Sequence, residues 1–146
     1  MATLKLSIKE ELVLNGKDRG SENVTSVTGV TQVDHRIITA TTTAQTLLLF
    51  GTTDAAGQIK DATVKYLRIT NLDTTNFVML RFVDTAVGSQ FWHKLAAGDS
   101  FISGNSLMYG DATGTAVAVS GNFVAMDVIH VDADTASCQL EVFVAT

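Results

Sequence analysis

The stretch of sequence that decides the fold reads Val64-Lys65-Tyr66-Leu67-Arg68-Ile69-Thr70, Asn71-Leu72-Asp73-Thr74-Thr75-Asn76, Phe77-Val78-Met79-Leu80-Arg81-Phe82-Val83. Its first and last parts are rich in β-branched and aromatic residues, which favour β-strands. The middle part is mostly Asn, Asp and Thr, whose short polar side chains bond to their own backbone and favour turns. The pattern therefore predicts two antiparallel strands joined by a short loop.

The two faces of this predicted hairpin differ in chemistry. If the loop closes symmetrically, one face holds only aliphatic residues and suits the core: Leu67, Ile69, Val78 and Leu80. The other face brings together guanidinium, aromatic and thioether groups: Tyr66, Arg68, Met79 and Arg81. Such groups are enriched in protein interfaces, so this second face is a candidate contact patch. The alternative interpretation is that these side chains cover a second sheet of the same chain.

Short strand patterns recur along the rest of the chain, with turn signals about every ten residues. The closing segment 139–144 alternates cleanly, with Leu140, Val142 and Val144 on one side and Glu141 on the other. No long helical pattern occurs. Residues 1–146 are therefore predicted to form one all-β domain, an antiparallel β-sandwich of jelly-roll-like topology, with an immunoglobulin-like topology as the alternative.

The N-terminal residues 1–20 are predicted to form a strand or an arm. Leu4, Leu6 and Ile8 alternate with polar residues, which is the period of a β-strand. A helix is the alternative, because apolar residues also recur here at intervals of four. We expect Leu4, Leu6 and Ile8 to pair as a strand with a neighbouring subunit; the alternative is that they belong to the protein's own sheet. In the next segment, Gly29 is interpreted as the site of a bulge or bend.

Composition limits the classes of protein to which this chain can belong. The chain has 146 residues, of which 46% are hydrophobic and 17% are charged. This is too apolar for a disordered chain and low in charge against a typical value of about 25%, as in domains that hide surface in an assembly. The net charge of −5, without a basic run, argues against nucleic acid as a partner. No apolar run is long enough for a membrane span.

No catalytic, cofactor or metal site is predicted. The single cysteine, Cys138, excludes an internal disulfide and a thiol zinc site, and it is expected to be buried in a strand. The three histidines lack the spacing of metal ligands. Asp132 and Asp134 alone supply too few oxygens for a calcium loop, and no nucleophile motif occurs. The chain is therefore expected to be no enzyme and to need no cofactor.

The central stretch resembles small virion structural proteins of tailed bacteriophages. The resemblance rests on Arg68-Ile69-Thr70-Asn71-Leu72-Asp73 with Asn76-Phe77-Val78, on the opening Leu4-Lys5-Leu6-Ser7-Ile8-Lys9-Glu10 with Leu14-Asn15-Gly16, and on the closing residues 137–144. It implies a capsid decoration (cement) protein that binds the outside of the head and bridges capsomers. The implied partners are the major capsid protein and further copies of the chain in a homotrimer. No catalytic residues come with the resemblance.

The implied location is the capsid surface of the virion, after synthesis in the cytoplasm of the host bacterium, since the N-terminus carries no secretion signal. The alternative function is a receptor-binding or carbohydrate-binding β-sandwich on a head fibre or tail. That function would need exposed aromatic side chains in a groove, and the candidates are Phe91, Trp92 and Tyr109.

Overall fold

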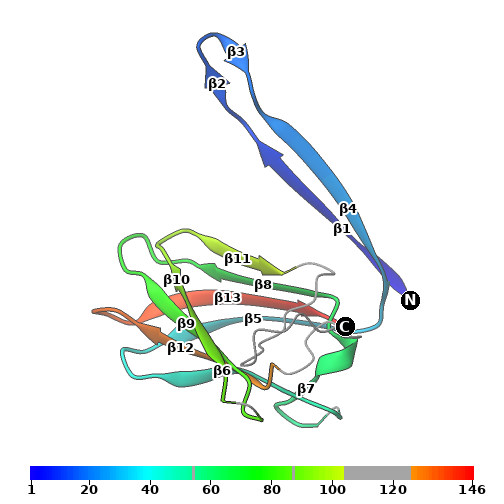
Figure 1. The fold of residues 1–146 in the computed structure, drawn as a ribbon, viewed down its shortest axis with the longest axis vertical. Helices are drawn as coiled ribbons and strands as arrows, with labels where there is room; N and C mark the ends of the chain where they lie inside the picture. The colour runs from blue at the N-terminus through cyan, green and yellow to red at the C-terminus, as the bar shows by residue number, and fades with distance from the viewer. Residues whose placement is uncertain (54, 87, 104–125) are drawn as a thin grey trace.

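Two sheets stacked face to face make up the body of the protein in the computed structural model (Figure 1), which describes residues 1–53, 55–86, 88–103 and 126–146. Their strands pair antiparallel, except for the short parallel pair of β6 and β7. One sheet has the strand order β11-β8-β13-β5 and the other β10-β9-β12-β6-β7. The strands of the first are β11 (Ser100–Ser103), β8 (Tyr66–Asn71), β13 (Cys138–Ala145) and β5 (Val33–Ala40). Those of the second are β10 (Gln90–Leu95), β9 (Val78–Val83), β12 (Val128–Ala133), β6 (Gln45–Gly51) and β7 (Ile59–Lys60). A short 3-10 turn, η1 (Asp61–Thr63), precedes β8.

The order of the strands identifies the topology. We number the long strands of the described body in chain order, from β5 as the first to β13 as the eighth. One sheet then contains the first, third, sixth and eighth, and the other contains the second, fourth, fifth and seventh. With the chain passing between sheets at most of its turns, this is the jelly-roll arrangement. The predicted all-β sandwich is confirmed, in its jelly-roll form rather than the immunoglobulin-like alternative.

Alternating side chains from both sheets fill the space between them. The fully buried set includes Leu67, Ile69, Leu80, Phe82, Ile129, Leu140 and Val142. In a strand every second side chain points to the same face, so one apolar parity per strand is enough to build this core. Burying each large aliphatic or aromatic side chain contributes about 1.5–3 kcal/mol. The closing segment behaves as predicted, with Leu140, Val142 and Val144 buried and Glu141 on the outer face.

The two central strands do not pair with each other, which corrects the predicted hairpin. β8 lies between β11 and β13, and β9 lies between β10 and β12. The polar break between them carries the chain from one sheet to the other. Its turn chemistry is as expected, since the carboxylate of Asp73 accepts the backbone N–H groups of Thr75 and Asn76, each at 2.7 Å. The aliphatic face is core because both strands point into the same interior from opposite sheets.

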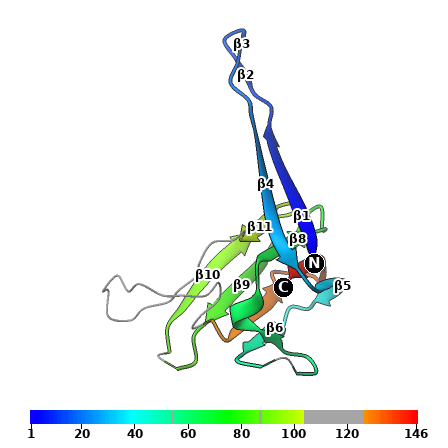
Figure 2. The ribbon, with the colours of Figure 1, turned by 90° about the vertical axis from the view of Figure 1, so that its right-hand side faces the viewer.

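An arm extends away from this body. It is the hairpin of β1 (Ala2–Glu10) and β4 (Ser21–Val30), with β2 (Val13–Leu14) and β3 (Lys17–Asp18) at its tip. Figures 1 and 2 show it rising well beyond the sandwich in both views. β1 is a strand, so the helical alternative is wrong. The register shifts between Ala2 and Leu4, opposite Gly29, whose φ of 71° marks the expected bulge.

Candidate functional site: the projecting arm

The alternation of β1 gives the arm one apolar and one polar face. Leu4, Leu6 and Ile8 pair with Val27, Thr25 and Asn23 of β4, so these six side chains share a face. The opposite face carries Lys5, Ser7 and Lys9 against Ser26, Val24 and Glu22. On that face, Ser7 donates a hydrogen bond to Glu22 at 2.7 Å. The period of two thus decides which side chains share a face, and it separates apolar from polar residues in β1 up to Lys9, whereas β4 places Val24 on the polar face.

The apolar face is covered only at its base. Leu4 and Leu6 are half-buried, and they pack with Val27 and Val30 against side chains of the body that lie on the outer face of the β8–β13 pair: Tyr66, Phe143 and Ala145. Further out, Ile8 is 52% exposed. The contact that fixes the arm to the body therefore ends before Ile8.

The tip of the arm exposes more apolar surface. Leu12 is 54% exposed, Val13 72% and Leu14 54%. These residues flank a two-residue turn in which both Asn15 (φ 53°) and Gly16 (φ 73°) have positive φ. Such a turn suits the right-handed twist of a hairpin, and Asn-Gly is its strongest sequence signal. The sequence thus predicts that the chain reverses at Asn15-Gly16. It does not predict that the hairpin projects away from the body.

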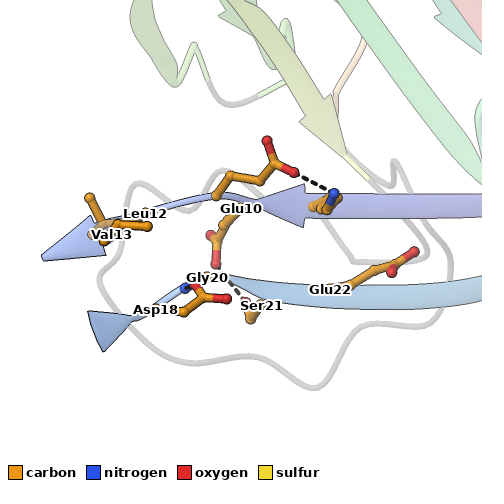
Figure 3. Close-up of a pocket in the computed structure, with 9 residues that line it drawn as sticks. Glu10, Leu12, Val13, Asp18, Gly20, Ser21 and Glu22 are labelled. Atoms are coloured by element: carbon orange, nitrogen blue, oxygen red, sulfur yellow. Dashed lines mark hydrogen bonds and ion pairs between the residues drawn. The ribbon is translucent and has the colours of Figure 1, made fainter. Parts of the chain in front are cut away.

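A hollow of about 570 Å³ lies where the arm bends below its tip (Figure 3). Four carboxylates line it, and each already has a partner within the arm. Glu10 accepts from the hydroxyl of Ser21 at 2.7 Å, and Glu22 from that of Ser7. Asp18 accepts the N–H of Gly20 at 2.8 Å, and Glu11 pairs with Lys9. We therefore interpret these acidic groups as shaping the bend.

The metal-ligating side chains and the thiol of the described residues give the following picture. No group of three or more His, Cys, Asp or Glu side chains in the described residues could hold a metal ion. Cys138 is buried, and burial raises the pKa of its thiol above the ordinary value, so the reactive thiolate is disfavoured at neutral pH. In the described part of the chain, no helix is both long enough and apolar enough to span a membrane.

The outer face of the β11-β8-β13-β5 sheet carries an ion network. Glu141 accepts from Arg68 Nη1 at 2.8 Å and contacts His35 Nε2 at 2.7 Å. These hydrogen bonds lower the pKa of Glu141 below its ordinary value, and the bond from Arg68 has the larger effect. Exposed isoleucines flank the network, with Ile37 on β5 61% exposed and Ile102 on β11 44% exposed. The result is a charged centre between two apolar edges.

The candidate patch proposed from the sequence is not one surface. Tyr66 and Arg68 lie on the outer face of their own sheet, whereas Met79 and Arg81 lie on the outer face of the other sheet. Tyr66 is buried beneath the base of the arm, and this burial raises the pKa of its phenol. Arg81 lies over the ring of Trp92 at 5.4 Å. The error follows from the assumed pairing of β8 with β9.

Two exposed isoleucines were missed although the sequence contained a signal for them. Ile37 and Ile38 are neighbours in one strand and so must point to opposite faces of the sheet. Ile38 packs against the core, which leaves Ile37 outside. The same reasoning applies to the neighbours Phe101 and Ile102 on β11.

The aromatic candidates for glycan binding are only partly within the described structure. Trp92 is 51% exposed, and Phe91 is 39% exposed and stacks on Phe82 with ring centroids 4.4 Å apart. Tyr109 lies outside the described residues.

Comparison of the chain with protein-family models, with curated proteins and with solved structures gives no match.

Proposed function

We propose that the chain is a non-enzymatic assembly protein of a phage virion, namely a capsid decoration protein that binds the outside of the head and bridges capsomers. The observation that carries the proposal is the projecting arm, whose apolar face runs beyond the contact with its own body. Exposed apolar surface of this kind is typical of protein interaction sites. A jelly roll occurs both in viral capsid proteins and in lectins, so the fold alone does not decide between them.

The proposed role also fits the remaining sequence features. The low charge fraction suits a protein that covers surface in an assembly, and the net charge of −5 keeps free copies apart before they dock. The implied partners are the major capsid protein and further copies of the chain. The implied location is the capsid surface.

Binding to empty heads tests the proposal. Purified protein is mixed with heads of the encoding phage that lack it, and the heads are sedimented. We expect the protein to sediment with these heads and to raise their resistance to heating. Heads that already carry a full complement of the protein are the matched control, because their sites are occupied. Equal binding to both kinds of head, or binding to neither, would contradict a decoration role.

A glycan-binding function is the second candidate, and the exposed Trp92 favours it. Arg81 holds one side of the indole ring, while half of the residue's surface faces solvent on the outer face of the second sheet. Because Trp92 is the sole tryptophan of the chain, its fluorescence reports on this surface alone. A saturable emission shift on addition of a host glycan, together with loss of glycan binding by Trp92→Ala in calorimetry, would favour this function over decoration.

A further inference from the structure

The outer half of the arm lacks a partner that its structure requires. Two-stranded hairpins are at best marginally stable in water unless their apolar face packs against something. At the base of the arm, the apolar face packs against Tyr66, Phe143 and Ala145 of the body. Beyond it, Ile8 and the tip residues are exposed. Ile8 and the apolar residues of the tip are therefore uncovered in the described part of a single copy.

The sheet face beneath the base of the arm continues in the same way. Across the sheet, Ala145 lies between Val33 and Tyr66, and the arm covers this end, with Ala145 and Tyr66 buried. Two residues further along the strands lies the row that contains Ile102, and four residues further lies the row that contains Ile37; both isoleucines are exposed. The arm from Ile8 outward and the outer face of the sheet beyond the arm are thus both uncovered in the described residues of a single copy.

We propose that the arm of one copy packs, through the face that carries Ile8, on the outer face of the β11-β8-β13-β5 sheet of a second copy, with Ile8 against the exposed apolar edge at Ile37. The contact between Leu4 and Leu6 and the sheet of their own copy is the template for it. This deepens the assembly role proposed above, since it names the surface through which copies of the chain join. Because every copy carries both surfaces, the exchange is either reciprocal between two copies or continues from copy to copy, and it forms a closed ring where the rotation between copies closes.

The dimensions of the arm suit this exchange. The nine residues of β1 span about 30 Å at 3.3 Å per residue. The eight residues of β5, which set the length of the receiving sheet, span about 26 Å by the same rise. Because Leu4 and Leu6 stay on their own body, the seven residues from Ile8 to Leu14 are free to extend, and they span about 23 Å by the same rise, which covers most of the receiving face of the next copy.

The distribution of charge favours a second copy of the chain as the occupant. Residues 1–30 contain four Lys or Arg and four Asp or Glu, so the arm has no net charge. The whole net charge of −5 therefore belongs to the body. Two bodies repel each other, but a neutral arm can approach a negatively charged body without this cost. The arm is the part of the chain best suited to bridge two copies.

Cross-linking between two variants, each with one cysteine added to the buried native Cys138, tests the proposal without any capsid. Ile8→Cys protein with one affinity tag is mixed with Ile37→Cys protein with another, and the mixture is oxidised and then blocked with a thiol reagent before denaturation. We expect a mixed-tag disulfide dimer. The matched control replaces the first variant with Val24→Cys, which lies on the opposite face of the same arm and is 49% exposed. The yield of mixed-tag dimer from the Val24→Cys variant should be several-fold lower than that from the Ile8→Cys variant.

The outcomes separate this inference from the proposed function. Equal yields from the Ile8 and Val24 variants would overturn the inference, as would a protein that light scattering finds to be a monomer at working concentrations. A monomer that still binds empty heads would overturn the inference alone, since the arm would then dock on the capsid protein. Cross-linked oligomers that bind no heads would overturn the decoration role and leave the exchange supported.

Discussion

At the scale of single residues, Glu141 is a charged group that the fold holds between two partners, Arg68 and His35. Its pKa is lowered from an ordinary value of 4.5, so the folded state binds the carboxylate form better than the unfolded state does. Its contribution to stability is therefore complete above about pH 4.5 and is lost as the pH falls through the lowered pKa.

The variant Glu141→Gln keeps the size of this side chain and removes its charge. We expect it to unfold at pH 7 with a free energy about 0.5–1 kcal/mol lower than the parent, the range of a partly exposed ion pair. Urea titrations measure the difference. The gap should narrow steadily as the pH falls below about 4.5. A gap that is the same at every pH would show that the charge of Glu141 does not act through these contacts.

Gly16 tests the turn at the tip of the arm. A Cβ placed there meets no atom within 4 Å, so Gly16→Ala is opposed only by the positive φ of 73°. We expect this strain to lower the local stability of the turn by about 1 kcal/mol. The effect should be confined to the tip of the arm. The Arg19 amide bonds to the Leu12 carbonyl at 2.7 Å, and its hydrogen exchange should speed up several-fold. Faster exchange in β13 as well would show that tip and body unfold together.

At the scale of elements, the sequence predicts each strand better than it predicts the strand's partner. Alternation and turn chemistry identified β8, β9 and the polar break, because these signals are local. A hairpin loop and a connection between sheets use the same turn residues, however. The choice between them depends on β13, which pairs with β8 and lies some seventy residues away in the chain.

In the arm too, the sequence identifies a strand but not its partner. Its first strand alternates clearly, and the Asn15-Gly16 turn marks the reversal. In β4 the valines recur every three residues, because Val24 belongs to the polar face and the bulge at Gly29 shifts Val27 relative to Val30. The sequence pattern therefore did not predict that β1 pairs with β4. Nothing local distinguishes a hairpin that joins the sandwich from one that projects from it.

Removal of the arm is the prediction that belongs to this scale. Thr31, Gln32 and Thr146 are joined by backbone hydrogen bonds of 2.7–3.2 Å, which tie the start of the body to its last residue. The buried contacts of the arm form a cluster separate from the sandwich core. A chain that begins at Thr31 should therefore keep its β-sheet circular dichroism and its Trp92 emission. Loss of a cooperative thermal transition would contradict this.

At the scale of the whole molecule, repulsion between the negatively charged bodies opposes association through the apolar surface of the arms. The bodies carry the charge of −5 and repel, while the arms are neutral. Association through the arms then brings bodies of the same sign together, and dissolved salt screens that repulsion. At about 0.15 M the screening length is about 8 Å, shorter than the arm itself.

We therefore expect association to strengthen as salt is raised from about 0.01 M, where the screening length is about 30 Å, to about 0.15 M. Sedimentation equilibrium at both concentrations gives the dissociation constants. The variant Val24→Asp adds a charge to the polar face of the arm and should keep this dependence. Ile8→Asp places the charge on the apolar face and should abolish association at either concentration. Association that weakens with salt would mean that opposite charges, rather than the apolar face of the arm, hold the copies together.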